Sequence, residues 1–360
     1  MNANHLIGGY ATYRILEIDT LNDETEIEFT FRLYRNLNNT GATLDRVIEM
    51  GIFQVMNDST GEYSVFESFG IGLESVNVVD LGINNVSIEF GDYIFRTRLE
   101  HGSDYLLSFQ RCCRPETITN LAIDEPFGFA IQLELTSQAL NTPIESPRIE
   151  GHPLSIHLLG NALDYEIPLI YSDTLEVMTH LASILSAGAV HPDNIQDCCD
   201  CVIPNPRNCL PPYDMAVYNS SYSGTNPFGD FNDILYEDNL FSGEFNIGGK
   251  FQYGIKINTY LSGELLSRQL VDHTLDVLTF TSTNERAENN IRMYPNPITD
   301  HIYIENAEGY NYQLVDLSGK IVSEGITQKK LNMPNLRGLY YLRIYSNEVE
   351  SVQKLVLNTK

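Results

Sequence analysis

The sequence predicts an all-β protein with two β-sandwiches in tandem, followed by a small C-terminal seven-stranded β-sandwich. Two observations predict this class. Segments in which apolar and polar residues alternate recur along the 360 residues, which is typical of half-buried strands. Gly, Asn and Asp separate these segments, as expected for turns. No window approaches the roughly 18 consecutive apolar residues that a membrane-spanning helix needs.

Residues 1–149 are expected to form the first sandwich. Alternation is nearly perfect in residues 26–35, and it recurs in residues 93–99 and 129–135. One polar face on each strand indicates antiparallel sheets with one side in water. Several strands of this length are typical of a sandwich.

Residues 150–281 are expected to form the second sandwich, with a short helical insert. Within residues 171–192 apolar side chains recur at helical spacing, and Asp173 or Thr174 could cap the helix. The spaced residues are Leu175, Met178, Leu181, Ala182 and Leu185. Cysteines follow directly, so the insert is either a partner-binding element or a disulfide-pinned surface excursion without a function of its own.

Charge separates the last part of the chain from the rest. Residues 285–360 carry 9 Lys+Arg and 9 Asp+Glu; the whole chain has 22 and 48, so residues 1–284 carry 13 and 39, a net charge of −26. Such a shift is a domain-boundary signal. The polar run over residues 282–290 is therefore expected to be a linker.

Residues 291–360 are expected to form the third sandwich. Alternating segments place six of the seven or so expected strands, at residues 300–306, 310–317, 320–325, 328–333, 339–346 and 349–357. A hairpin turn is expected at residues 316–320, where Gly319 tolerates a positive φ.

This segment contains sequence landmarks in a fixed order. They are Tyr294, Pro295, Asn296 and Pro297, then Asp316, Gly319 and Lys320 in the turn, then Gly338 and Tyr340 at the start of a strand, and Lys354 in the last strand. In these landmarks the segment resembles the type A sorting domain of type IX secretion, which exports proteins across the outer membrane of Bacteroidota. The resemblance implies an export signal that binds the secretion translocon or its outer-membrane shuttle barrel through residues 291–360.

The body of the chain carries a second, more scattered resemblance. Residues 7–13, 107–114, 222–229 and 249–257 are similar to parts of large gliding-motility-associated surface proteins with immunoglobulin-like or PKD-like domains. The resemblance implies that the sandwich of residues 1–149 is immunoglobulin-like and that of residues 150–281 is immunoglobulin-like or PKD-like. Those proteins are mostly structural or adhesive. The chain departs from them at residues 160–167, where their acidic Asp-x-Asp-Gly-Asp turn is missing.

The six cysteines predict disulfides in an exported protein. They are Cys112, Cys113, Cys198, Cys199, Cys201 and Cys209. If the strand over residues 105–111 continues, Cys112 and Cys113 point to opposite faces, so each is expected to find a distant partner. Three disulfides are expected, with at least one from the Cys112–Cys113 pair to the 198–209 cluster. Zinc is the competing interpretation, but the usual paired C-x₂₋₄-C spacing is absent.

Two features concern processing. The chain starts without a signal peptide, so a leader removed on export is expected. The tripeptides that begin at Asp19, Asp58 and Asp173 resemble the O-glycosylation signal of Bacteroidota, which makes Thr20, Ser59 and Thr174 candidate acceptors.

Composition and motifs argue against several classes of function. The acidic body argues against nucleic acid, whose phosphates it would repel. Calcium is an alternative for clustered carboxylates, although no EF-hand-type loop is present, and no other cofactor is expected. No H-E-x-x-H, G-x-S-x-G or P-loop motif occurs, so neither a catalytic nor a metal site is assigned.

The expected function is that of a non-enzymatic secreted protein on the extracellular face of the outer membrane. It would act as an adhesin-like, structural or accessory subunit, with other outer-membrane proteins as candidate partners. Extracellular glycan binding is the alternative, ahead of hydrolysis. The chain has 21 Tyr and 16 Phe but no Trp, which slightly disfavours a sugar-stacking platform.

Overall fold

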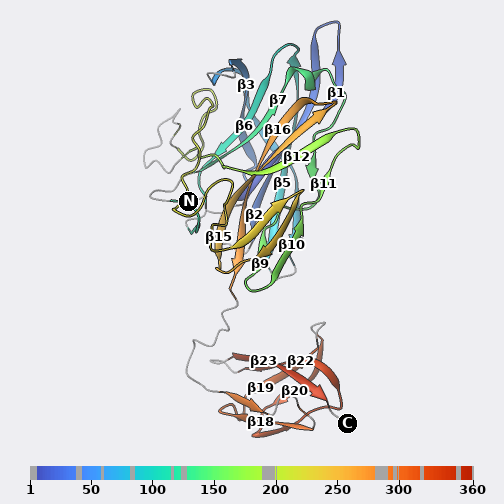
Figure 1. Ribbon diagram of the computed structural model, residues 1–360, viewed down its shortest axis with the longest axis vertical. Helices are drawn as coiled ribbons and strands as arrows, with labels where there is room; N and C mark the ends of the chain where they lie inside the picture. The colour runs from blue at the N-terminus through green and yellow to red at the C-terminus, as the bar shows by residue number, and fades with distance from the viewer. Residues whose placement is uncertain are drawn as a thin grey trace. The chain divides into compact units, whose positions relative to one another are not determined.

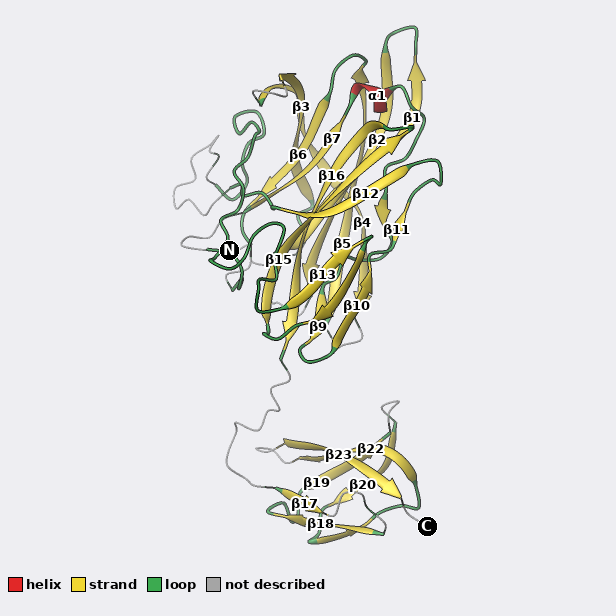
Figure 2. Ribbon diagram, in the orientation of Figure 1, coloured by secondary structure: helices red, strands yellow, loops and turns green. Residues whose placement is uncertain are grey.

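The structure is a computed structural model with two compact units, Met1–Thr279 and Phe280–Lys360. It describes residues 6–37, 43–57, 61–81, 86–114, 117–122, 128–188, 199, 201–279, 291–294, 298, 300–316, 320–345 and 350–358. The all-β class is confirmed, because α1 (Ser137–Leu140) is the only helix in these ranges (Figure 2). The predicted linker at residues 282–290 lies outside them.

An 11-stranded sheet, antiparallel except at one strand, organises the first unit (Figure 1). Its main order is β1 (Leu6–Asp19), β2 (Glu24–Asn36), β5 (Ser87–Glu100), β4 (Glu62–Asp80), β3 (Val47–Asn57), β6 (Tyr105–Arg111), β7 (Phe129–Leu135), β16 (Glu264–Leu278), β15 (Gly249–Leu261) and β12 (Glu176–Ala182). β9 (Ile156–Leu158) adds a parallel pairing to β16. β1 pairs with β2 and also, at Gly8 and Gly9, with β16, so the sheet folds back on itself.

The alternation in β2 shows why these segments are strands. Ile27, Phe29, Phe31 and Leu33 are fully buried in the first hydrophobic core. The intervening residues face the other side of the sheet. Burying each such side chain stabilises the fold by roughly 1.5–3 kcal/mol, so the period-2 pattern fixes which face of the strand turns inward.

A second core lies beneath smaller sheets. β10 (Ala162–Glu166), β14 (Leu240–Glu244) and β13 (Asp233–Glu237) form a three-stranded sheet, and β8 (Arg148–Ile149) pairs with β11 (Leu169–Ile170). Phe228, Phe241 and Phe251 pack in this core beside Tyr253. Strands on both sides of the expected boundary between residues 149 and 150 contribute to the main sheet, so the body does not divide there.

The predicted helical insert is wrong. Residues 176–182 form strand β12, which pairs with β15 from Glu176 opposite Tyr260 to Ala182 opposite Gly254. The deciding pattern has period 2: Val177, Thr179 and Leu181 turn inward, whereas Met178 is mostly exposed. Cross-strand pairing with β15 outweighed the helical spacing of the apolar residues.

The C-terminal unit is the predicted seven-stranded sandwich. One sheet contains β17 (Arg292–Tyr294), β18 (His301–Glu305) and β21 (Lys330–Asn332); the other contains β20 (Ile321–Ile326), β19 (Asn311–Val315), β22 (Arg337–Tyr345) and β23 (Glu350–Asn358). Ile302 and Ile304 from the first sheet share one core with Leu314, Leu342 and Leu355 from the second. The unit therefore has a hydrophobic core of its own, as an independent domain requires.

Candidate functional site

The first sorting landmark, Tyr294, lies at the end of β17. Its hydroxyl donates to Glu305 Oε1 at 2.7 Å, and its ring lies 5.7 Å from that of Tyr303 on β18. Pro295, Asn296 and Pro297 lie outside the described residues. The chain continues at Ile298, whose amide donates to the Val356 carbonyl at 2.8 Å. The landmark thus starts where the chain crosses from one sheet of the sandwich to the other.

The second landmark is the turn between β19 and β20. The Asp316 amide donates to the Lys320 carbonyl, and the Lys320 amide donates to Asp316 Oδ1, both at 3.0 Å. The aspartate side chain therefore accepts a hydrogen bond across the hairpin turn and helps to close it. Gly319 lies outside the described residues.

The third landmark lies on β22 and on β23, the edge strand that pairs with it. Gly338 has φ +125° and pairs with Leu357. This backbone region favours glycine. Tyr340 turns toward the core of the unit, and Tyr341 on the opposite face pairs with Lys354. The landmarks that the structure describes therefore fix turns and the core of the sandwich rather than converge on one catalytic point.

The cysteines form local bonds. Cys112 and Cys113 are bonded to each other and both are buried; Cys199 is bonded to Cys209. Cys201 is also disulfide-bonded, and Cys198 lies outside the described residues. The expected bond from the Cys112–Cys113 pair to the 198–209 cluster is therefore wrong. β6 ends at Arg111, so the alternation that would have separated the two sulfurs does not extend to them.

Hydrogen bonds make the connection that a disulfide was expected to make. The Cys112 amide donates to the Val202 carbonyl at 3.0 Å, and Arg111 Nη1 donates to the same oxygen at 3.3 Å. Arg111 also forms a 3.0 Å ion pair with Asp45. Burial lowers the pKa of Arg111, and the charge of Asp45 opposes that shift. The segment around Val202 is thus anchored to the end of β6.

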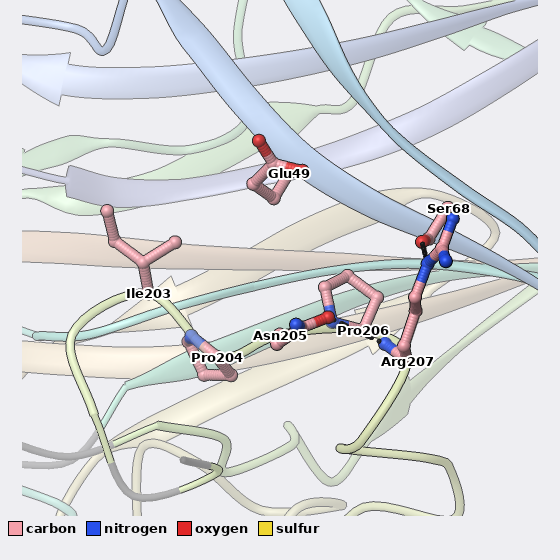
Figure 3. Close-up of a pocket in the computed structure, with 7 residues that line it drawn as sticks. All are labelled: Glu49, Ser68, Ile203, Pro204, Asn205, Pro206 and Arg207. Carbon is pink, nitrogen blue, oxygen red and sulfur yellow. Dashed lines mark hydrogen bonds between the residues drawn. The ribbon is translucent and has the colours of Figure 1, made fainter. Parts of the chain in front are cut away.

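A hollow of about 600 Å³ lies between this anchored segment and the outer face of β3 and β4 (Figure 3). Its lining residues are Glu49, Ser68, Ile203, Pro204, Asn205, Pro206 and Arg207. Arg207 Nε donates to Ser68 Oγ at 2.7 Å. Nothing in the sequence singled out Glu49 or Arg207, because only the tertiary fold places residues so distant in sequence around one space.

The candidate glycosylation acceptors lie in turns where the structure describes them. Thr20 is exposed in the turn between β1 and β2. The backbone amides of Leu21 and Asn22 donate to Asp19 Oδ1 and stabilise this turn. Thr174 is exposed in the turn before β12. Ser59 lies outside the described residues. Modification of these residues stays a prediction.

The described residues contain no group of three or more His, Cys, Asp or Glu side chains placed to hold a metal ion. Within the same ranges, no helix combines the length and apolar character needed to cross a bilayer. Calcium binding stays a prediction.

Comparison with known proteins identifies the C-terminal unit. Residues 292–358 match the family described as the secretion system C-terminal sorting domain. No curated protein matches the chain. Among solved structures, an ICAM-5 D1–D4 ectodomain fragment is 9% identical, with 93% of this chain and 83% of that chain covered and a TM-score of 0.18. The BSP domain of a biofilm associated protein is 8% identical, with 98% and 82% covered and a TM-score of 0.16.

The two structural likenesses are too low in TM-score to support an argument about fold or function. The family match does support one. The chain carries a sorting tail for type IX secretion, so it is a secreted protein exported by that route.

Proposed function

We propose that this protein is a non-enzymatic cell-surface protein that stays on the extracellular face of the outer membrane as an adhesin-like or structural subunit of a complex there. The observation that carries the proposal is the pairing of a sorting domain with a separate, much larger all-β body. The sorting domain supplies the address, through contact with the secretion translocon or its shuttle barrel. The body is what arrives at the surface.

The body has the features of a durable scaffold. Long antiparallel strands carry cross-strand ion pairs, such as Arg32 Nε with Asp92 at 2.7 Å and Arg35 Nε with Glu89 at 2.6 Å. Each arginine contacts its carboxylate through two nitrogens, which is a geometrically specific arrangement. Such features suit a protein that must keep its shape outside the cell.

Cell fractionation tests the proposal. The full chain, tagged in an exposed turn, is expressed in a host with type IX secretion, and a variant that ends after Thr281 is the control. The full chain should be accessible to added protease on intact cells and should co-purify with outer-membrane proteins. Recovery of the full chain only from culture medium, with no membrane partner, would contradict the subunit role while leaving export intact.

Glycan binding is a second candidate function, and one observation favours it. The hollow beside β3 and β4 combines a carboxylate, a guanidinium, an amide and a hydroxyl with apolar side chains. Sugar-binding sites need such a mixture of polar partners and apolar surface.

A further inference from the structure

The floor of the hollow is built from small residues on two paired strands. On β3 and β4, Gly51 lies opposite Ser68, and Glu49 lies opposite Gly70. A Cβ atom at Gly70 would lie 3.2 Å from Glu49 Oε1, and one at Gly51 would lie 2.9 Å from Pro206 Cβ. The two glycines therefore make room on the sheet, one for the carboxylate and the other for the wall above it.

The wall is residues 203–207, and its shape is braced from several directions. The Cys199–Cys209 bond closes the segment, and the amides of Asn208 and Cys209 both donate to the Asn205 carbonyl at 3.0 Å. The Arg207 amide donates to Asn205 Oδ1 at 3.0 Å. A braced wall reduces the ordering cost that a ligand would have to offset on binding.

The polar groups around the hollow complement one another. Among the described residues, the ion pairs include neither Glu49 nor Arg207. Arg207 donates from Nε to Ser68 Oγ. Figure 3 shows the Arg207 side chain reaching Ser68, with Glu49 across the hollow from the proline-containing wall. The site thus offers a carboxylate acceptor and guanidinium donors that no ion pair between described residues engages.

Apolar surface lies beside these groups. Ile203 is 53% exposed, and Pro204 and Pro206 complete the wall. A ligand that fits must combine hydroxyl groups, which both donate and accept, with an apolar C–H face. A sugar ring meets both requirements. The volume of about 600 Å³ is also within the usual range for small-ligand sites, roughly 300–1,000 Å³.

We infer that this hollow binds one neutral saccharide residue of a glycan, with Glu49 accepting from and Arg207 donating to neighbouring hydroxyls. The inference rests on the second candidate function above and is independent of the export route. One carboxylate and one guanidinium leave the site without net charge. The net charge of −26 on residues 1–284 disfavours an anionic sugar.

Methyl NMR of the full chain tests the inference, since the Ile203 methyl group reports on the hollow directly. The neutral probes are the methyl glycosides of glucose, galactose, mannose and N-acetylglucosamine. Two anionic sugars, galacturonate and N-acetylneuraminate, and glycine, which has charged groups but no sugar ring, are tested for comparison. At least one neutral glycoside should shift the Ile203 signal in a saturable titration at millimolar concentration, of order 1–10 mM. The Ile170 methyl group, on β11 and 36% exposed, should stay unchanged.

Substitutions make the test specific. Glu49→Gln and Arg207→Met should each weaken neutral-sugar binding about tenfold, since each removes a charge-assisted hydrogen bond. Arg148→Met is the matched control, an exposed arginine outside the hollow, and should bind as the unchanged chain does. Unchanged fingerprints of the other isoleucine methyl groups establish that each variant is folded.

Three results would overturn the inference: no Ile203 shift with any neutral glycoside, a shift with only the anionic sugars or glycine, or equal weakening by Arg148→Met. Each of these is compatible with surface export, so failure here is separable from failure of the fractionation experiment.

Discussion

The two units differ in how many polar side chains their interiors contain. The first unit buries many polar groups: Arg114, Asp272, Gln252 and Thr274 form a connected network, and His273 Nε2 lies 2.8 Å from Ser155 Oγ. In the C-terminal unit, Thr327 is the only polar side chain that is buried among the described residues. Buried polar networks tie a fold to one arrangement, whereas an apolar core needs only volume and pattern.

This difference fits the roles proposed for the units. A sorting domain has to fold behind whatever body precedes it, so a self-contained apolar core suits it. The body has to hold one surface in place, and its polar network links distant segments: Arg114 contacts Asp272 on β16 and the carbonyls of Gly128 and Leu185. The contrast predicts different responses to the same kinds of perturbation.

The largest effect is expected from Arg114→Met. Its ion pair with Asp272 is almost completely buried, at 3% and 0% exposure, so removing the arginine leaves a buried carboxylate without its countercharge. The first unit should lose about 3–5 kcal/mol of unfolding free energy. Arg268→Met, which breaks a half-exposed pair with Glu134, is the control and should cost under about 1 kcal/mol. Denaturant unfolding compares them, and equal costs would show that the buried network is not special.

Leu342→Ala should have a comparable effect confined to the other unit. Leu342 is fully buried in the C-terminal core, and truncating such a side chain costs about 2–5 kcal/mol. Calorimetry of the full chain should show the C-terminal transition moving down and the first unit's transition staying in place. Movement of both transitions would mean that the units do not fold independently.

Lowering the pH should decrease the unfolding free energy of the first unit, by less than the two substitutions above. Burial lowers the pKa of His273 to about 3, below the ordinary value of 6.5 that it regains on unfolding. Between these values the unfolded chain binds a proton that the folded chain does not, so stability falls as the pH falls. The loss from this group is about 1.4 kcal/mol per pH unit below 6.5, or about 2 kcal/mol at pH 5.

His273→Gln should remove that part of the pH dependence. Unfolding curves of the first unit at pH 7 and pH 5 measure it, and His157→Gln, at a partly exposed histidine, serves as the control. If His273→Gln and the unchanged chain lose the same stability between the two pH values, the buried neutral histidine is not the cause.

Gly338→Val should give the smallest change in stability, about 1–2 kcal/mol in the C-terminal unit, because φ is +125° there. Export should nevertheless decrease, since the turn into β22 is one of the sorting landmarks. Leu339→Val, at the next position, keeps a permitted backbone and should be exported normally. Surface protein measured by protease shaving compares the two variants; equal export would remove Gly338 from the signal.

Local pattern predicted many of the strands but contains no information on which strands pair. The period-2 segments at residues 26–35 and 129–135 lie within β2 and β7, and the shift in charge near residue 285 comes within a few residues of the unit boundary at Phe280. The alternation and the shift in charge both depend only on residues that are neighbours in sequence. In contrast, the pairing of β7 with β16, more than 100 residues later, depends on tertiary packing that no local window contains.

The same limit explains the errors in the candidate sites. The sorting landmarks follow one another in order within one segment, so the sequence alone could predict the sorting domain. The Cys112–Cys113 bond depends on where β6 ends, and β12 depends on its neighbour β15. Glu49 and Arg207 are brought around one hollow only by the loop that packs on Gly51, which a linear pattern cannot indicate.

Transfer of the sorting domain tests the central claim most directly. Residues 282–360 are fused to an inert fluorescent reporter that carries a periplasmic leader, and the fusion is expressed in a host with type IX secretion. The autonomous core of the C-terminal unit predicts that the reporter reaches the cell surface or the medium, whereas the same fusion with Leu342→Ala stays in the periplasm. Retention of the unaltered fusion in the periplasm, with its C-terminal unit folded, would contradict the claim that this unit alone directs export.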